Sequence, residues 1–362
     1  MYPILNIVKV ITPAAIAFFI GIAITPLVTH YLYKYKAWKK KGGKVGLDGK
    51  PTTVRDQIHA EKDVGTPRMG GIIVWASALI TIFGFFALAR LLPESSFTKL
   101  DFLSRNQTWL PLFTLVAGAF VGFVDDLLEI KGSRDYRAGG MSLRKRLLIV
   151  GVISAAVGWW LYMKLEVVSI GIPFLSDLHV GALIVPIFMF VTLCIYAGGI
   201  IDGIDGLSGG VFAAMFSSYS AIAFYHNQIN LAAFCAMIVG ALLAFVWFNI
   251  PPARFYMTET GMMGLTLTLA TIAFMTDTLG DGIGVSVLPI IAFPLVITVA
   301  SVVLQIFSKR LRGKKLFRVA PLHHHFEAVG WPSYKVAMRY WVISVIFAFL
   351  GLIVALIATP LP

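Results

Sequence analysis

The chain has 362 residues, of which 58% are hydrophobic and only 13% are charged, and its mean hydropathy is +0.83. Soluble domains are usually about 45–50% apolar and about 25% charged, so this composition excludes a soluble protein and predicts an integral membrane protein with many spans. The net charge of +12 does not require nucleic acid, because it gathers in the loops between apolar segments. Cys194 and Cys235 lie far apart inside apolar segments, which is typical of core residues rather than of a disulfide framework or metal cluster.

About ten apolar segments are long enough to cross a bilayer. This pattern predicts an all-α polytopic protein with a single transmembrane domain over 1–362. The predicted spans are approximately 5–33, 70–92, 109–124, 144–164, 181–200, 206–224, 230–248, 261–277, 285–307 and 336–359.

Alternating crossings place the segments 34–69, 125–143, 201–205, 249–260 and 308–335 on one side of the membrane, and 25 of the 30 Lys and Arg residues lie on that side or at the span ends beside it. The positive-inside rule therefore predicts that this side is cytoplasmic and that both termini are extracytoplasmic. The acidic and histidine residues beside the spans fall on the same side, so we expect these five loops to form an active site there. These residues are Asp125, Asp126, Asp202, Asp205, Glu259, His323, His324 and His325.

The first candidate motif along the chain is the segment 65–71 (G-T-P-R-M-G-G), which opens the second predicted span. Glycines before a helix can present backbone N–H groups to a phosphate. A simple turn with a close helix contact has the same pattern, so this motif leaves both interpretations open.

Asp125 and Asp126 end the third predicted span. Adjacent positions cannot share one helix face, so we expect the two carboxylates to have different roles. Near a phosphate they would suit Mg²⁺, which prefers oxygen ligands and usually retains waters and substrate phosphates. A solvated polar helix end is the alternative.

The segment 196–210 (Y-A-G-G-I-I-D-G-I-D-G-L-S-G-G) places Asp202 and Asp205 among glycines and between two apolar runs. Carboxylates so close to the membrane are costly and usually functional. A continuous helix would put both on one face, whereas the glycines also permit a broken helix that approaches a ligand closely. The third arrangement is a helix start with Asp202 as the cap and Asp205 in the first turn.

The proline-stiffened segment 247–259 combines Asn249, several aromatic side chains and Glu259 in one compact loop. This mixture can hold a planar base by stacking and by hydrogen bonds to its edge. An interfacial loop with an aromatic belt is the alternative.

The most unusual segment is 321–327, which contains three consecutive histidines. Adjacent imidazoles point in different directions, and no cysteine or H-E-x-x-H partner supports zinc. Imidazoles that face a diphosphate fit the pattern better. Six cations precede the histidines and either mark the topology or attract anionic substrates; they are Lys309, Arg310, Arg312, Lys314, Lys315 and Arg318.

Together these segments resemble the polyprenyl-phosphate N-acetylhexosamine-1-phosphate transferases. The resemblance covers nearly the whole chain, from H-A-E-K-D-V-G-T-P-R-M-G-G at 59–71 to G-W-P-S at 330–333, and its most specific part is 308–332. The triple histidine followed by G-W-P is similar to the branch of the family that acts on N-acetylmuramoyl substrates.

The resemblance implies a Mg²⁺-dependent enzyme of the bacterial inner membrane whose active site faces the cytoplasm. It would transfer phospho-MurNAc-pentapeptide from UDP-MurNAc-pentapeptide to undecaprenyl phosphate, giving lipid I and UMP. Proteins of this family often form homodimers.

Matched residue by residue, the resemblance also implies a set of site residues. Asp125 and Asp126 would be the paired catalytic carboxylates near the lipid phosphate. Asp202 and Asp205 match catalytic carboxylates of the nucleotide–metal site, where Glu259 completes the metal ligands. Two or more of the three histidines would contact the diphosphate or the incoming sugar. The remaining matches are to nucleotide-binding residues, namely Asn249 beside the uridine, Tyr256 against the uracil, Lys62 and Thr66.

Several positions depart from the family pattern. Tyr196 and Gly199 stand where the family has Asn, and Thr258 stands where it has Gly. Glu259 replaces the usual metal-binding Asp and is one methylene longer, although it remains a hard oxygen ligand. Three alternatives stay open: a sibling transferase that transfers GlcNAc-1-phosphate from UDP-GlcNAc, a divergent relative of low activity, and a transporter, since transporters also carry carboxylates in broken helices.

Overall fold

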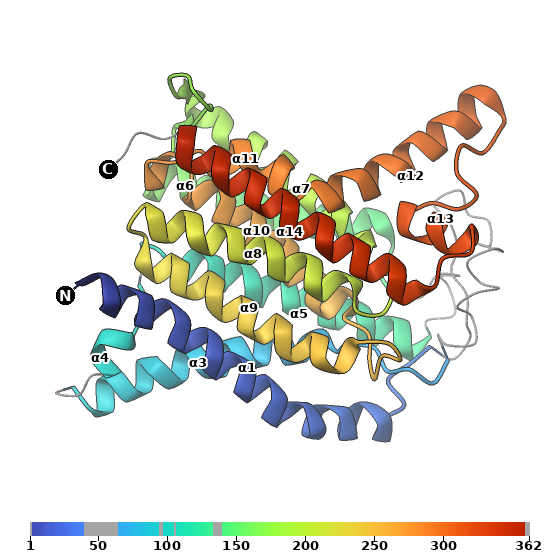
Figure 1. Ribbon diagram of the computed structural model, residues 1–362, viewed down its shortest axis with the longest axis horizontal. Coiled ribbons are helices and arrows are strands. Elements are labelled where there is room, and N and C mark those ends of the chain that lie inside the picture. The colour runs from blue at the N-terminus through green and yellow to red at the C-terminus, as the bar shows by residue number, and fades with distance from the viewer. Residues whose placement is uncertain (1, 40–63, 94–96, 105, 133–139, 359–362) are drawn as a thin grey trace.

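The computed structural model describes residues 2–39, 64–93, 97–104, 106–132 and 140–358, and they form a bundle of long helices (Figure 1). Among the described residues, nine helices are long and apolar enough to cross a membrane. This confirms the prediction of an all-α polytopic membrane protein.

The bundle contains thirteen described α-helices with short connections. One connection holds the antiparallel strand pair β1 (Ser169–Ile170) and β2 (Leu178–His179), and three others hold the 3-10 turns η1 (Gly181–Leu183), η2 (Gly199–Ile201) and η3 (Thr278–Gly280). The α-helices are α1 (Tyr2–Lys34), α3 (Gly71–Leu91), α4 (Phe97–Leu100), α5 (Trp109–Lys131), α6 (Leu143–Lys164), α7 (Ile184–Gly198), α8 (Leu207–Tyr225), α9 (Ile229–Asn249), α10 (Thr258–Met275), α11 (Gly284–Ile291), α12 (Phe293–Arg312), α13 (Leu322–Ala328) and α14 (Ser333–Ala358).

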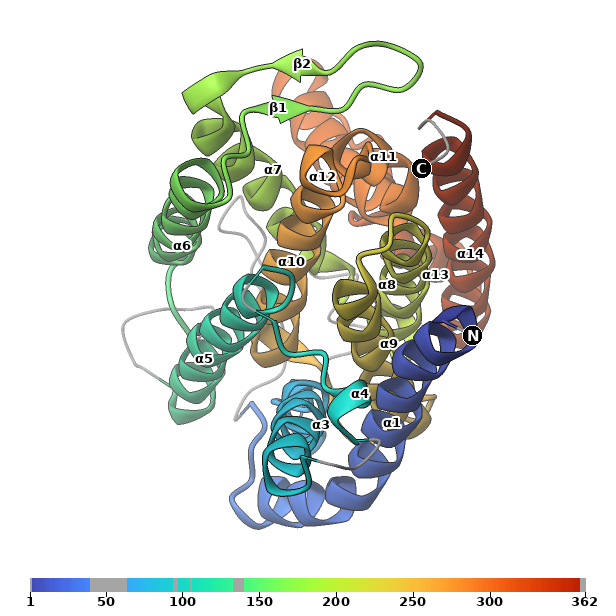
Figure 2. The same ribbon diagram turned by 90° about the vertical axis from the view of Figure 1, so that its left-hand side faces the viewer.

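Helix α10 lies in the middle of the bundle (Figure 2), and almost all of its residues are buried. It corresponds to the predicted span 261–277 but is not one of the nine strongly apolar helices, because it is rich in threonine. The hydroxyls of Thr266 and Thr271 donate to the carbonyls of Met262 and Leu267, 2.8 and 2.9 Å away, so these buried groups are satisfied within the helix. A polar helix is therefore stable here because other helices separate it from lipid.

Glycines allow α5 to approach α10 very closely. Gly118 and Gly122 lie one turn apart on α5, and a Cβ at either position would clash with backbone atoms of α10, near Gly264 and Glu259 respectively. The following turn of α5 therefore brings the two adjacent aspartates to the first turn of α10.

The helices differ from the predicted spans at two places. Helix α5 continues to Lys131, so Asp125 and Asp126 belong to its last turns instead of opening a loop at 125. The predicted span 285–307 is divided into α11 and α12, with Pro294 in the first turn of α12. Proline has no N–H and fits a helix start, which explains why the chain can change direction here. Helix α12 then diverges from the bundle towards α13 (Figure 1).

The two ends of the bundle are different. The start of α1, the end of α14 and the β1–β2 pair lie at one end, which we name the hairpin end (Figures 1 and 2). The last turns of α5, the start of α10 and α13 lie at the other end. The charge distribution predicts that this second end faces the cytoplasm.

Candidate active site

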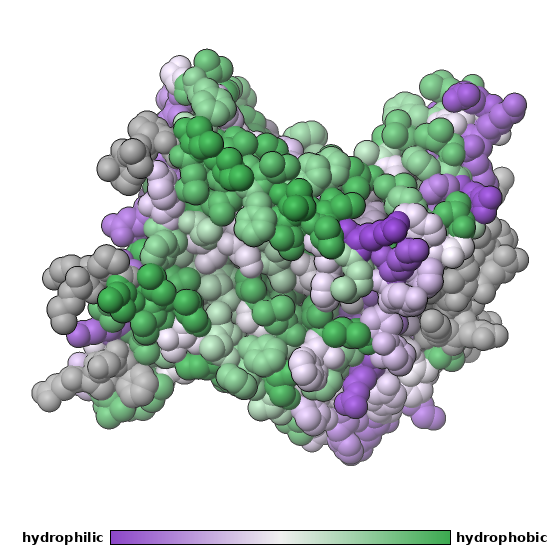
Figure 3. All heavy atoms as spheres, in the orientation of Figure 1, coloured by the Kyte–Doolittle hydropathy of each residue, from purple (hydrophilic) through white to green (hydrophobic). Residues whose placement is uncertain are grey.

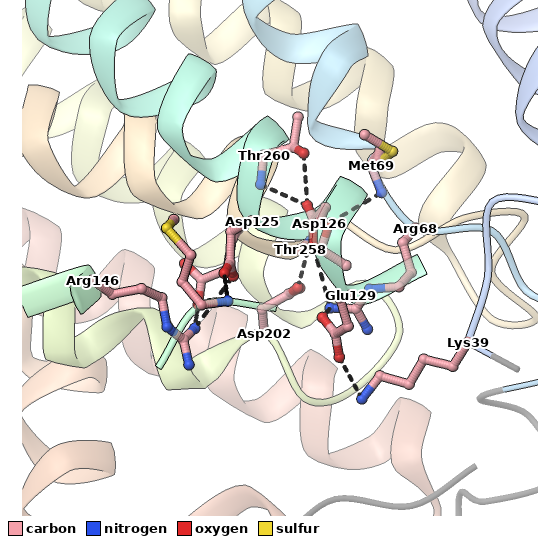
Figure 4. A network of polar contacts seen from close by, with 12 residues as sticks. Lys39, Arg68, Met69, Asp125, Asp126, Glu129, Arg146, Asp202, Thr258 and Thr260 are labelled. Carbon is pink, nitrogen blue, oxygen red and sulfur yellow. Dashed lines mark hydrogen bonds and ion pairs between the residues drawn. The ribbon is translucent and has the colours of Figure 1, made fainter. Parts of the chain in front are cut away.

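Asp126 is fully buried and lies at the centre of a polar network (Figure 4). Its Oδ2 accepts a hydrogen bond from the backbone N–H of Thr260 at 2.9 Å and from the hydroxyls of Thr258 and Thr260. Its Oδ1 lies 3.4 Å from Nη2 of Arg68. These bonds join α5 to the first turn of α10 and to the segment before α3, so Asp126 positions the surrounding elements.

Glu129 extends this network by one turn of α5. Its Oε2 lies 2.6 Å from Nη2 of Arg68, and its Oε1 lies 2.7 Å from Nζ of Lys39. Burial disfavours the charged guanidinium of Arg68, but the adjacent Glu129 and Asp126 raise its pKa above the ordinary value. The sequence analysis missed Glu129 and Lys39, although the i,i+3 spacing from Asp126 to Glu129 was a usable signal.

Arg146, in the first turn of α6, connects two carboxylates from different helices. Its Nη1 lies 2.6 Å from Oε1 of Glu259 and 3.6 Å from Oδ2 of Asp125. Asp125 also accepts a hydrogen bond from the backbone N–H of Met141. The sequence analysis missed Arg146 because it was counted as a topology signal. The Glu259 side chain keeps 23% of its surface exposed and the Asp125 side chain only 3%, so Glu259 is the more accessible of the two.

Asp202 and Asp205 lie in a break between helices. The turn η2 ends at Ile201 and α8 begins at Leu207, so of the three arrangements left open by the sequence the structure has the broken helix. Asp202 accepts hydrogen bonds from the Ser208 hydroxyl at 2.7 Å and from the backbone N–H of Thr258 at 2.9 Å. Asp205 accepts one from the backbone N–H of Ala253 at 3.2 Å. The break is thus attached to the start of α10.

Two of the three histidines lie against this break. A Cβ on Gly203 would lie 2.6 Å from Nε2 of His323 and 2.8 Å from Nε2 of His324. Both rings are buried, and Nδ1 of His324 shares a hydrogen bond of 2.7 Å with Oε2 of Glu327. A carboxylate on Nδ1 fixes the ring and leaves Nε2 directed at the glycine turn.

The third histidine points elsewhere. Nδ1 of His325 accepts a hydrogen bond from the backbone N–H of Arg318 at 3.2 Å, and its ring packs on the edge of Phe317. The short helix α13 therefore divides the triplet. His323 and His324 are directed at the break at 202–206, which we name the aspartate turn, and His325 is directed at the loop from α12.

Asn249 is buried and braces two loops. Its Oδ1 accepts a hydrogen bond from the backbone N–H of Gly206 at 2.8 Å, and its Nδ2 donates to the carbonyl of Phe255 at 2.7 Å. The backbone of Tyr256 pairs with the segment before α3, through Pro67 and Gly70 at 2.8 Å each. Their contacts with a nucleotide stay predictions.

Thr66 and Lys62, the other predicted nucleotide-binding residues, have a different status. Thr66 is half-buried beside the pairing of Pro67 with Tyr256. Lys62 lies outside the described residues. Their contacts with a nucleotide also stay predictions.

Thr258 occupies a strained position. Its φ is +56°, in the left-handed region that a β-branched residue rarely adopts, and the resemblance has glycine here. Its hydroxyl donates to Asp126 and accepts a hydrogen bond from the backbone N–H of Met69 at 3.0 Å. The side chain thus makes contacts that glycine could not make, in a conformation that glycine would adopt more easily.

The donor chemistry of the site fits a divalent cation. Within the described part of the chain, no three His, Cys, Asp or Glu side chains form a ready metal-binding group. The network nevertheless contains five carboxylates and three cations, which leaves two formal negative charges. Hard carboxylate oxygens with this excess suit Mg²⁺, which takes one or two protein ligands and completes its shell with water and phosphate. The carboxylates are Asp125, Asp126, Glu129, Asp202 and Glu259, and the cations are Lys39, Arg68 and Arg146.

Two guanidinium groups of the site also carry N–H donors without a partner among the described residues. Nε of Arg68 and Nε of Arg146 are buried and have no hydrogen-bond partner among the described residues. Guanidinium N–H groups match phosphate oxygens well. The site therefore combines metal-compatible oxygens with phosphate-compatible donors.

Comparison with known proteins gives a consistent result. Residues 108–277 match the family described as Glycosyl transferase family 4. A phospho-N-acetylmuramoyl-pentapeptide-transferase from Geobacillus sp. (strain WCH70) is 31% identical over 347 residues, which cover 93% of this chain and 95% of the relative. Proteins of the same name from Clostridium perfringens (strain SM101 / Type A) and Rickettsia bellii (strain OSU 85-389) are 30% and 31% identical; the alignments cover 95% and 94% of this chain, and 96% and 91% of those relatives.

Proposed function

This chain belongs to the phospho-N-acetylmuramoyl-pentapeptide-transferase family, and from that premise we propose that it transfers phospho-MurNAc-pentapeptide from UDP-MurNAc-pentapeptide to undecaprenyl phosphate, giving lipid I and UMP. The observation that carries this proposal is the meeting of α5, α6, α10, the break before α8 and α13 at one end of the bundle. Carboxylates, guanidinium groups and imidazoles from distant parts of the sequence gather there. A transporter is less well supported, because these groups lie at one end of the bundle rather than near its middle.

Phosphoryl transfer depends mainly on positioning and on neutralising negative charge. An oxygen of the lipid phosphate would attack the β-phosphorus of the nucleotide sugar, and UMP would leave. Asp125 would orient the lipid phosphate and accept its remaining proton. That proton transfer contributes little near neutral pH, because the second pKa of a phosphate is about 6.

The cations and histidines would bind the diphosphate. Arg146 already lies between Asp125 and Glu259 with 24% of its side chain exposed, so its guanidinium is placed to meet a phosphate oxygen beside these carboxylates. His323 and His324 would direct their Nε2 atoms at the diphosphate beside Gly203. Asp126 would act as a positioning residue, because it is fully buried and bonded to the start of α10 and to the segment before α3, whereas Asp202 is only partly buried.

Mg²⁺ is part of this proposal. Asp202 and Glu259 would hold the ion. Asp205, which lies in the same turn as Asp202, would be a third carboxylate beside it. When bound, Mg²⁺ would neutralise charge on the diphosphate and on the leaving UMP.

We also propose that the protein lies in the bacterial inner membrane with this site facing the cytoplasm and both termini outside. The placement of 25 of the 30 Lys and Arg residues supports this orientation. Labelling of single cysteines introduced near residues 2 and 318 with a membrane-impermeant reagent tests it, and we expect only the first to be labelled in intact cells.

A release assay tests the activity. Purified protein with undecaprenyl phosphate should release UMP from UDP-MurNAc-pentapeptide in the presence of Mg²⁺, and EDTA should stop the release. UDP-GlcNAc serves as the competing donor. Turnover with UDP-GlcNAc alone would assign the chain to the sibling transferases, and turnover with neither donor would refute the proposal.

A further inference from the structure

An apolar groove lies between α13 and α14. We name it the α13–α14 groove, and its volume is about 250 Å³. Within α13, Phe326 lines the groove, whereas His323 and His324 point at Gly203. The lining residues are Phe326, Trp331, Val336, Arg339, Tyr340 and Ile343.

Two cations lie over one aromatic ring at the mouth of this groove. The guanidinium carbon of Arg339 is 4.0 Å from the centroid of the Trp331 ring, and Nζ of Lys335 is 5.6 Å from it. Both cations are exposed, and neither forms an ion pair with a carboxylate of the described residues. A cation–π contact holds such charges in place while their N–H groups stay available to an anion.

The groove lies where the apolar surface of the bundle ends. Figure 3 shows hydrophobic surface along α14 that gives way to hydrophilic surface at the end beside α13. The same face of α14 exposes large apolar side chains beyond the two cations, at Val342, Val345, Ile346 and Phe349. A ligand that fits this surface has an anionic head at the cations and a long apolar chain along the helix.

We propose that the α13–α14 groove binds one anionic phospholipid of the surrounding bilayer. Its phosphate lies on Lys335 and Arg339, and one acyl chain lies over Trp331 and along α14. Charge complementarity favours an anionic over a zwitterionic headgroup, because the mouth of the groove carries two cations that pair with no carboxylate of the described part of the chain.

Lipid in this groove also stabilises the helix that carries the catalytic histidines. The ring of Trp331 stacks on Phe326 of α13 with centroids 4.8 Å apart and planes 15° apart. A chain packed on Trp331 therefore restrains α13 and keeps His323 and His324 against the aspartate turn. This consequence for turnover rests on the proposed function, whereas the binding does not.

Binding is measured without turnover, by native mass spectrometry of the full-length protein in detergent titrated with phosphatidylglycerol or phosphatidylcholine. The groove variant is K335Q/R339Q. The matched control is K309Q/R312Q, which removes two exposed cations from the end of α12. We expect phosphatidylglycerol affinity to fall about 30-fold in the groove variant only, in keeping with two headgroup contacts. A third variant, Ile343→Gln, weakens the chain contact and keeps the charges, and the melting temperature of each variant confirms folding.

Several results would overturn the proposal. Equal phosphatidylglycerol affinity of the groove variant and the wild type would exclude this site, and equal affinity for both lipids would exclude recognition of the headgroup. Displacement of phosphatidylglycerol by inorganic phosphate would show that the apolar groove takes no part. Competitive displacement by undecaprenyl phosphate would assign the groove to the lipid substrate instead. Loss of lipid binding with full UMP release in the groove variant would leave the binding site intact as a proposal but refute its effect on turnover. Lipid binding by a wild-type protein that releases no UMP would refute the proposed function and leave the lipid site standing.

Discussion

Each end of the bundle buries an aspartate, and different kinds of donor satisfy the two carboxylates. Asp277, at the hairpin end, accepts hydrogen bonds from the backbone N–H groups of Gly171 and Val285 at 2.7 and 2.8 Å. Asp126, at the opposite end, is bound by two threonine hydroxyls, one backbone N–H and a guanidinium.

The difference distinguishes a structural carboxylate from a cluster of carboxylates for which we propose a role in the reaction. Backbone donors are fixed in place, so Asp277 holds the β1–β2 connection to the start of α11 and needs no cation. At the opposite end Asp126 and three further carboxylates share three side-chain cations, and side chains can exchange those partners for a ligand. A lone buried carboxylate is thus a brace, whereas a cluster with mobile partners can perform chemistry.

The largest expected effect is on turnover. Asp202→Asn should lower kcat by about 100- to 1,000-fold, because it removes charge where the diphosphate and its metal would bind. The protein should still insert and purify, since the Asn Oδ1 can accept the hydrogen bond from the backbone N–H of Thr258 while its Nδ2 donates to the Ser208 hydroxyl. UMP release measures the change.

The matched control for this variant is Asp277→Asn, at the hairpin end. We expect it to keep kcat within about twofold of wild type while lowering thermal stability. Wild-type turnover by Asp202→Asn would contradict a role of Asp202 in the reaction. Inactivity of Asp277→Asn with an intact fold would contradict a purely structural role of Asp277.

The next effect concerns the histidines. Gly203→Ala should lower kcat about 10-fold or more, because its Cβ would displace Nε2 of His323 and His324 from their positions. Gly151→Ala is the control, since a Cβ at that position of α6 meets no atom within 4 Å. Equal activity of the two variants would remove these imidazoles from the site.

A pH effect is expected at the hairpin end. Burial raises the pKa of Asp277 to about 6, although its backbone hydrogen bonds oppose the shift. The folded protein then binds more protons than the unfolded chain between about pH 4 and pH 6, so this group favours folding as the pH falls through that window.

Wild-type protein should therefore gain stability relative to Asp277→Asn by about 1–3 kcal/mol between pH 7 and pH 4.5. Melting temperatures of the two proteins across this pH range measure the difference in stability. Other titrating groups contribute equally to both proteins, so their effects cancel in the comparison. Parallel pH profiles would contradict the assigned shift.

A smaller effect concerns the strained threonine. Thr258→Ala loses the hydroxyl contacts and keeps the left-handed backbone, whereas Thr258→Gly loses the same contacts and relieves the strain. The glycine variant should be more stable than the alanine variant by about 1 kcal/mol, and thermal melting of both measures this. Greater stability of the alanine variant would show that residue 258 does not retain its positive φ.

The smallest effect is expected at the unusual glutamate. Glu259→Asp should keep turnover within a few-fold of wild type or improve it, because a carboxylate remains at the predicted metal position. The kcat and the Mg²⁺ concentration for half-maximal rate test this together. A collapse of turnover would mean that the ion pair with Arg146 requires the longer side chain.

The sequence alone determined the fold class, the family resemblance and most of the candidate acids. Apolar segments of bilayer length identify spanning helices because hydropathy is a local average. Loop motifs such as the aspartate turn and the triple histidine also lie in short, continuous stretches. Both kinds of signal can be read without knowing which helices are neighbours.

The tertiary structure alone decided which groups meet. Asp126 and Thr260 are 134 positions apart and meet because glycines on α5 let it touch α10, while Arg146 joins Asp125 to Glu259 across three helices. The division of the histidine triplet and the α13–α14 groove depend equally on how a seven-residue helix is placed. Such contacts follow from close packing between distant segments, and no local average of the sequence contains that information.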